Sequence, residues 1–151
     1  KQIAGEGGDD FLIGGSAGDS IDGGTGADRL DGRAGDDTLS GGAGDDTLYG
    51  GAGQDTLDGG SGSDLLQGDD GDDTYWVRDA TDRIVDSGGD DTAYITVDGV
   101  KLPQGIEHVV YLGGAQPLPY WIDALVPASG AGLLARTLPT ADKASTCFSA
   151  T

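Results

Sequence analysis

The chain has 151 residues, 30 of them glycine, and a formal net charge of −19 from 27 acidic and 8 basic side chains. Glycine at this level, well above the usual ~7%, predicts a thin apolar core. So few basic residues leave no patch to meet phosphates, and we expect no nucleic-acid partner. No apolar run approaches the ~20 residues of a membrane-spanning helix, so we expect no transmembrane segment.

Residues 5–76 repeat a nine-residue pattern without a slip in register. The eight copies read GEGGDDFLI, GGSAGDSID, GGTGADRLD, GRAGDDTLS, GGAGDDTLY, GGAGQDTLD, GGSGSDLLQ and GDDGDDTYW, or Gly-Gly-x-Gly-x-Asp-x-apolar-x. A fixed short period predicts a solenoid of tight turns, whereas the same composition without a period would suggest disorder. A compact body with so many carboxylates repels itself unless cations fold with it.

Each copy predicts one turn followed by one short strand. The glycines permit backbone conformations with positive φ, and in Thr47-Leu48-Tyr49 the middle side chain points away from its neighbours. The inward position through the eight copies forms an apolar column of Leu12, Ile21, Leu30, Leu39, Leu48, Leu57, Leu66 and Tyr75. Two copies make one coil of eighteen residues. We therefore predict an all-β fold, a parallel β-roll whose odd copies form one sheet and even copies the other.

The sixth position of every copy is an aspartate. Asp10, Asp28, Asp46 and Asp64 would line one edge of the roll (the odd edge), and Asp19, Asp37, Asp55 and Asp73 the other (the even edge). Calcium takes six to eight oxygen ligands, more than one turn supplies, but two turns stacked about 4.8 Å apart can supply them. Three gaps on each edge predict up to about six calcium ions in the roll.

An isolated aspartate beside a glycine more often solvates or caps a turn. That alternative does not explain eight aspartates at one phase with glycines at fixed offsets. The turn-solvating alternative fits the aspartates at the fifth position, because the residue type at that position varies among the copies. These aspartates are Asp9, Asp36, Asp45 and Asp72. We expect these four carboxylates to be solvated charge.

The nonapeptide resembles the hemolysin-type calcium-binding repeat of the RTX (repeats-in-toxin) family. The resemblance implies a ligand set of backbone carbonyls from the first four turn positions together with the sixth-position aspartate. The implied metal ligands are the eight aspartates of the two edges and Gly14, Gly15, Gly23, Gly24, Gly26, Gly32, Gly35, Gly41, Gly42, Gly44, Gly50, Gly51, Gly53, Gly59, Gly60 and Gly62. Four copies depart from the pattern at Glu6, Ala17, Arg33 and Asp69-Asp70, so the central gaps match it best.

The outward strand positions differ between the two predicted sheets. Those of the odd copies include Phe11, Ile13, Tyr49 and Leu65, whereas those of the even copies are mostly polar. Because an exposed apolar patch needs a cover, we expect the C-terminal part of the chain or a neighbouring molecule to cover the odd sheet partly. Scattered apolar surface residues are the alternative.

Beyond residue 76 the glycine period ends and strands are expected at 83–85, 91–97 and 107–112, bounded by glycine and proline. The phrases DRIVDSGGDDTAYITV and LPQGIEHVVYLGG resemble the longer coils that follow RTX repeats. This implies that residues 77–114 continue the roll and cap its open end. The expected cap core is Tyr75, Trp76, Val85, Tyr94, Ile95, Val109 and Tyr111.

The predicted organisation is a roll in residues 1–76, a cap in 77–114, and a linker with a loosely ordered tail in 115–151. In the last segment LPYWIDALVP resembles the junction between RTX repeats and the peptidase domain of serralysin-like secreted metallopeptidases. Residues 137–151 lack the acidic-apolar ending usual for a secretion signal of this family. The chain therefore does not locate that signal.

The sequence carries no catalytic motif. HExxH and GxSxG are missing, and no long helix follows the glycine strings that mimic a dinucleotide fingerprint. His108 follows Glu107 in an expected strand, where neighbouring side chains point to opposite faces. We expect no enzyme in this chain, no catalytic residues, and calcium as the only cofactor.

The RTX resemblance implies a calcium-binding module of an extracellular bacterial protein. Such a protein leaves the cell unfolded by type I secretion, folds on binding calcium, and has an attached catalytic or adhesive domain that the module stabilises or templates. One alternative is a non-catalytic fragment of a secreted protease or lipase. Another is an adhesive surface module that binds polysaccharide through the aromatic residues Tyr49, Trp76, Tyr120 and Trp121.

Overall fold

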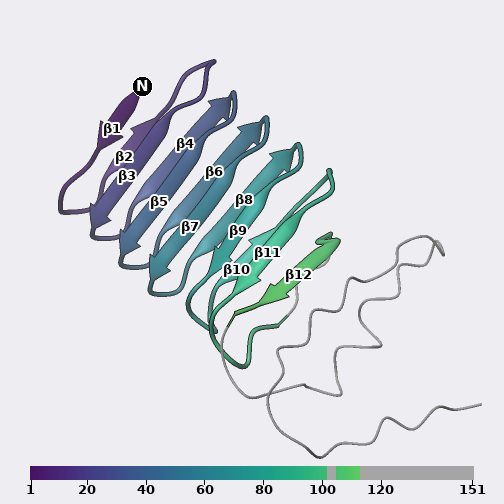
Figure 1. Cartoon of the computed structure of the whole chain (residues 1–151). Helices are drawn as coiled ribbons and strands as arrows, with labels where there is room; N and C mark the ends of the chain where they lie inside the picture. Colours follow the sequence, from purple (N-terminus) through teal and green to yellow (C-terminus); the bar gives the residue numbers. More distant parts are fainter. Residues whose placement is uncertain (102–104, 113–151) are drawn as a thin grey trace, which may run out of the picture.

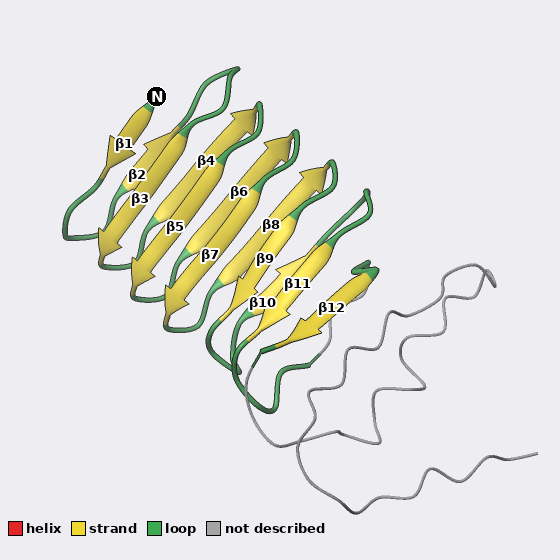
Figure 2. Cartoon of the chain, in the orientation of Figure 1, coloured by secondary structure: helices red, strands yellow, loops and turns green. Residues whose placement is uncertain are grey.

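The nine-residue period folds as two parallel sheets that face each other (Figures 1 and 2), and the buried apolar side chains lie between them. The structure is a computed structural model that describes residues 1–101 and 105–112. Every regular element in these residues is a strand, and the sheets have seven and five strands. The predicted parallel β-roll is confirmed.

The even copies lie in the seven-stranded sheet and the odd copies in the five-stranded sheet. In spatial order the first contains β1 (Gln2–Ala4), β3 (Ser20–Thr25), β5 (Thr38–Ala43), β7 (Thr56–Ser61), β9 (Thr74–Val77), β11 (Thr92–Ile95) and β12 (His108–Tyr111). The second contains β10 (Arg83–Val85), β8 (Leu65–Asp70), β6 (Thr47–Ala52), β4 (Arg29–Ala34) and β2 (Phe11–Ile13). The strands of the central copies run past the predicted three residues into the following glycines.

Neighbouring strands pair in parallel with a constant offset of one coil. Leu39 lies opposite Leu57 in one sheet, and Leu48 lies opposite Leu66 in the other. Because two nine-residue copies separate each pair, identical repeat positions stack on one another. The turns therefore gather along two long edges of the roll (Figure 1).

The core is the apolar column between the sheets. From Ile21 to Tyr75 its side chains are 0–1% exposed, and Leu12 at the N-terminal end is partly buried against them. The column continues through Val77, Ile84, Ala93, Ile95, Val100 and Ile106. Leucine in nearly every copy gives the layer a uniform thickness, as close stacking of coils requires.

The nine-residue phase continues beyond the last glycine-rich copy. Ile84 and Ala93 occupy the inward position, nine and eighteen residues after Tyr75. β11 then pairs with β12 at an offset of sixteen residues, Thr92 lying opposite His108. The last described coil is thus shorter by two residues than those of the repeats.

The expected cap core is correct only in part. Tyr75 and Ile95 are buried, and Val109 and Tyr111 pack against the core. Trp76, Val85 and Tyr94 instead occupy outward strand positions and are half-buried. Trp76 and Tyr94 stack on the outer face of the seven-stranded sheet, with ring centroids 4.9 Å apart. Successive side chains of a strand point to opposite faces of the sheet. Each of these three residues follows an inward-pointing residue, so its own side chain points outward.

The outer face of the five-stranded sheet carries an aromatic pair held by an arginine. The Arg29 guanidinium carbon lies 4.5 Å from the centroid of the Tyr49 ring and 5.5 Å from that of Phe11, and Phe11 is 59% exposed. A cover from residues 113–151, the LPYWIDALVP junction, Tyr120 and Trp121 lie outside the described residues. In the part of the chain that is described, no helix is long and apolar enough to span a membrane.

Candidate calcium sites along the two edges

The glycine turns follow one backbone conformation. The second and fourth positions have positive φ, as at Gly42 (108°) and Gly44 (134°). The predicted ligands with this conformation are Gly24, Gly26, Gly35, Gly42, Gly44, Gly51, Gly53, Gly60 and Gly62. A Cβ at Gly42 would collide with the Gly24 carbonyl oxygen of the previous coil, so stacking as well as φ requires glycine.

Three copies place a larger residue at the second position. Glu6, Arg33 and Asp69 have φ values of 75°, 77° and 75°, which side chains disfavour. The turn therefore keeps its conformation where the sequence departs from the pattern. The coils on either side impose the strain locally.

The sixth-position aspartates form a hydrogen-bonded ladder along each edge. The backbone N–H of Asp28 donates to Asp46 Oδ1 at 2.8 Å, and the N–H of Asp37 donates to Asp55 Oδ1 at the same distance. Every sixth-position aspartate from Asp10 to Asp73 donates in this way to the aspartate eighteen residues later. One oxygen of each acceptor carboxylate is thus held by the preceding coil.

The second carboxylate oxygen is buried without a hydrogen-bond donor in most of these residues. This holds for Oδ2 of Asp10, Asp28, Asp37, Asp46, Asp55, Asp64, Asp73 and Asp91. Seven of these side chains, all except Asp10, belong to residues that are 0–2% exposed. A buried carboxylate oxygen without a partner is strongly unfavourable, and a cation between the coils would satisfy a regular row of them.

The first-position glycines lie beside these oxygens. The point that a Cβ on Gly23 would occupy is 2.5 Å from Asp28 Oδ2 and 2.6 Å from the Gly41 carbonyl oxygen of the next coil. A side chain at this position would collide with both oxygens, so glycine is required where the two oxygens approach each other. The equivalent two oxygens, Oδ2 of the sixth-position aspartate and the carbonyl oxygen of the first-position glycine one coil later, lie against Gly5, Gly14, Gly32 and Gly41. A carboxylate and a carbonyl from successive coils thus converge where the sequence predicts a calcium ion.

Gly50 and Gly59, the last two first-position glycines of the predicted set, have different nearest neighbours. The nearest atoms to a Cβ on Gly50 or Gly59 all belong to Asp55 or Asp64, with no carbonyl of the next coil among them. The turn at residues 14–19 also differs. None of its residues has positive φ, and the Gly15 N–H donates to Asp19 Oδ2 at 2.6 Å. Ala17 at the fourth position accounts for this different turn.

Sequence reasoning missed two further members of the ladders. Asp82 and Asp91 follow Asp73 at intervals of nine residues, and they accept the N–H groups of Asp64 and Asp73 at 3.2 and 2.7 Å. The phase of the repeat identifies both, but their copies lack most of the glycines. Asp82 Oδ2 accepts the N–H groups of Arg78 and Asp79, so this turn satisfies its carboxylate with backbone donors.

Glu107 is the last member of the even ladder among the described residues. The Asp91 N–H donates to Glu107 Oε2 at 3.0 Å, across sixteen residues instead of eighteen. The glutamate side chain is longer than that of aspartate. In the shortened last described coil it accepts the same kind of backbone hydrogen bond that the aspartates accept in the earlier coils. The neighbouring His108 points elsewhere and pairs with exposed Asp90 at 2.9 Å.

The fifth-position aspartates are exposed, but they are more than solvated charge. Asp9, Asp36, Asp45 and Asp72 each accept the backbone N–H of the fifth-position residue one coil later, at 2.9–3.0 Å. They therefore tie neighbouring turns together from outside. The stacking of the coils determines how these carboxylates are oriented, and the residue types at the fifth position do not reveal it.

Burial in the ladders alters the acidity of the carboxyl groups. Desolvation raises the pKa of Asp55, Asp64 and Asp73 to about 6, and it raises those of Asp37 and Asp46 in the same direction. Desolvation and the nearby Asp86 raise the pKa of Asp91 to about 7. Without a cation the ladders therefore hold protons more tightly than exposed aspartates do.

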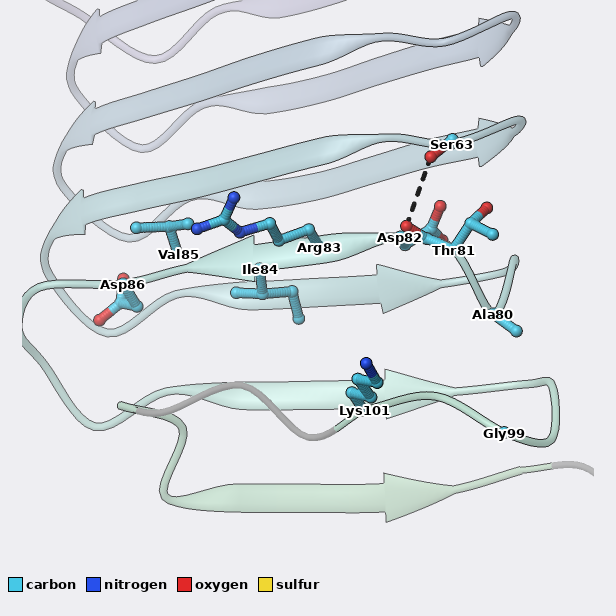
Figure 3. Close-up of a pocket in the computed structure, with 10 residues that line it drawn as sticks. All are labelled: Ser63, Ala80, Thr81, Asp82, Arg83, Ile84, Val85, Asp86, Gly99 and Lys101. Carbon is cyan, nitrogen blue, oxygen red and sulfur yellow. Dashed lines mark hydrogen bonds between the residues drawn. The ribbon is translucent and has the colours of Figure 1, made fainter.

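A pocket of about 870 Å³ lies beside β10 and does not resemble a catalytic centre (Figure 3). Its described lining includes Asp82 and Asp86, which lie at opposite ends of β10, and the cationic residues Arg83 and Lys101. The two residues are thus separated by the length of β10, about 13 Å between their Cα atoms in extended backbone.

Comparison with known proteins identifies the repeat. A family model for the RTX calcium-binding nonapeptide repeat matches four times, at residues 4–39, 22–57, 31–66 and 49–79, which together cover half of the chain. No curated protein matches the chain. No solved structure matches it either. The matched residues contain the eight sixth-position aspartates and the glycine turns between them, and the chain belongs to the RTX calcium-binding repeat family.

Proposed function

We propose that this chain is the calcium-dependent folding module of a secreted bacterial protein. The observation that carries the proposal is the row of buried Oδ2 atoms without donors along both edges of the roll. The calcium ligands would be these carboxylates and the carbonyls of the glycine turns, in up to about six gaps. The match to RTX calcium-binding repeats supports calcium as the ion.

The carboxylates couple ion binding to folding. Each buried carboxylate oxygen left unpaired opposes folding by about 1–3 kcal/mol or more, and like charges stack along each edge. A cation between coils removes both penalties, and because the unfolded chain has no preformed site, binding free energy becomes folding free energy. Weak extracellular calcium modules bind at about 10⁻⁴–10⁻³ M. The chain would thus be unfolded at low cytosolic calcium and folded outside the cell.

This coupling suits type I secretion, in which a protein crosses the envelope unfolded. RTX repeats are typical of secreted bacterial proteins, and folding after export would stabilise or template an attached catalytic or adhesive domain. A non-catalytic fragment of a secreted protease or lipase fits the same chemistry. In each case the chain itself contributes calcium-dependent structure and no reaction.

The proposal is tested by far-UV circular dichroism of the whole chain in EDTA and then in millimolar calcium. We expect an unfolded spectrum in EDTA, a strand spectrum after calcium is added, and much less structure with an equal concentration of magnesium. Magnesium is a suitable control because it requires a tight octahedron and gives up water reluctantly. A strand spectrum already present in EDTA would contradict the proposal.

The adhesive alternative has less support. The rings of Tyr49 and Trp76 are each faced by an arginine, with the guanidinium carbon of Arg29 or Arg78 at 4.5 and 5.4 Å from the ring centroid. Arg78 also forms a bidentate pair with Asp58. Calcium-dependent binding on a glycan array would nevertheless restore this candidate.

A further inference from the structure

Three carboxylates meet where the glycine pattern ends on the even edge. Asp73 precedes β9, Asp86 follows β10, and Asp91 precedes β11. One ligand atom of each lies within 4.8 Å of the others. Asp86 occupies the first repeat position, where all eight glycine-rich copies have glycine. This turn therefore has a carboxylate at a position where those copies have no side chain.

Two of the carboxylates have a buried oxygen without a partner. Asp73 and Asp91 are 1% and 0% exposed, and Oδ2 of each lacks a hydrogen-bond donor. Their Oδ1 atoms are already held, by the N–H of Asp55 at 2.8 Å and by that of Asp73 at 2.7 Å. The hydrogen bonds of the ladder therefore fix both side chains and leave the second oxygen available.

A tyrosine changes the chemistry of this turn. A Cβ on Gly68 would meet Asp73 Oδ2 and the Tyr75 hydroxyl, whereas at Gly5, Gly14, Gly23, Gly32 and Gly41 a backbone carbonyl lies beside the aspartate. The Tyr75 hydroxyl donates to Asp86 Oδ1 at 2.7 Å, and the Gly88 N–H donates to Asp86 Oδ2 at 3.0 Å. The phenol thus takes the position of the carbonyl and holds the third carboxylate toward the other two.

We propose that Asp73, Asp86 and Asp91 bind an additional divalent cation, in a site built from three carboxylates instead of the carboxylate–carbonyl pairs of the repeats. Carboxylate ligands select hard cations such as calcium, and a greater ligand charge gives tighter binding. This site therefore binds calcium before the repeat turns do. It shares Asp73 with the proposed repeat sites but depends on Asp86, which belongs to none of them.

The test is a calcium titration of the whole chain by isothermal calorimetry, with Asp86→Asn compared with Asp72→Asn. Both variants lose one negative charge, but Asp72 is exposed and only accepts the Asp90 N–H, which an amide oxygen can also accept. We expect Asp86→Asn to lose the tightest ion or weaken it at least about tenfold, and Asp72→Asn to bind like the wild type. Equal ion counts and affinities for Asp86→Asn and the wild type would overturn the proposal.

A second readout covers the case in which Asp86→Asn does not fold. Terbium replaces calcium at oxygen sites and emits when a neighbouring tyrosine is excited. We expect the first equivalent of terbium to show strong emission in the wild type, most of which Tyr75→Phe removes while the ion count is kept. Unchanged emission in Tyr75→Phe would contradict the site. Asp46→Asn should lower the ion count and keep the first-equivalent emission, so failure of the repeat sites is distinguished from failure of this one.

Discussion

Asp46 Oδ1 accepts a hydrogen bond from the backbone N–H of Asp28, 2.8 Å away and one full coil earlier in the chain. The bond orients the carboxylate and leaves Oδ2 facing Gly41 without a donor. The same arrangement recurs at most positions along both edges, so these aspartates join two coils through Oδ1 and leave a buried Oδ2 for the cation that we propose. Coil stacking and the proposed ion binding would therefore depend on the same side chain.

Neighbouring aspartates should differ sharply in their effect on calcium. Asp46→Asn removes a buried carboxylate charge at a central gap, and we expect it to lower the number of bound calcium ions and raise the calcium concentration needed for folding. Asp45→Asn is the control, because its amide oxygen can still accept the Ser63 N–H from outside the roll. Calorimetry and circular dichroism measure both. Equal losses of bound calcium in the two variants would refute the separate roles of the fifth-position and sixth-position aspartates.

Acidification should stabilise the calcium-free roll. The pKa values of Asp55, Asp64 and Asp73 are raised to about 6 and that of Asp91 to about 7, so the folded state binds protons more tightly than the unfolded state. Their contribution to stability is fully present below about pH 4 and is lost as pH rises through 6 to 7. In calcium-free buffer the strand signal in circular dichroism should therefore increase from pH 8 to pH 4.

Protons should have the opposite effect on calcium binding. Because calcium requires deprotonated carboxylates, the calcium concentration at the folding midpoint should rise as pH falls from 7 to 5. A midpoint independent of pH would argue against ligation by the buried aspartates.

Arg33→Gly should stabilise the roll. Arg33 has φ 77° at a position where most copies have glycine. Relief of the left-handed strain, less the backbone entropy that glycine adds, should raise the free energy of unfolding in calcium by about 0.5–1 kcal/mol. Urea unfolding measures the change, and Arg33→Ala is the control because it removes the side chain and keeps the strain. An equally large increase in the free energy of unfolding in Arg33→Ala would assign the stabilisation to loss of the arginine charge instead of relief of strain.

The core column should tolerate little loss of volume. Leu48 is 0% exposed in the middle of the column, so Leu48→Ala should lower the free energy of unfolding in calcium by about 2–5 kcal/mol. The outward neighbour Thr47 provides the comparison, and Thr47→Ala should change it by less than about 1 kcal/mol. Similar losses at the two positions would mean that the inward face has been assigned wrongly.

The period alone predicts most of the roll. A strict nine-residue register determines the inward column, the two parallel sheets and the two rows of sixth-position aspartates. The positive φ of Arg33 and Asp69 also follows from their phase, because neighbouring coils impose the turn on whichever residue stands there. In a solenoid each copy contacts mainly its neighbours, so local pattern and tertiary structure coincide.

The sequence is less informative where the pattern thins. Asp82 and Asp91 keep the phase in copies that lack most of the glycines, so a search for complete repeats passes over them. The contact between Tyr75 and Asp86 joins residues that occupy different repeat positions, and no periodicity predicts it. Trp76 and Tyr94 look like core residues by composition, but the alternation of their strands places them outside.

The most direct test of calcium between the coils is anomalous scattering from crystals grown in calcium. We predict anomalous peaks along both edges, each within bonding distance of a sixth-position Oδ2 and a glycine carbonyl of the next coil, as beside Asp28 and Gly41. Well-ordered crystals that show the same roll, with no anomalous peak beside these aspartates at saturating calcium, would contradict the account.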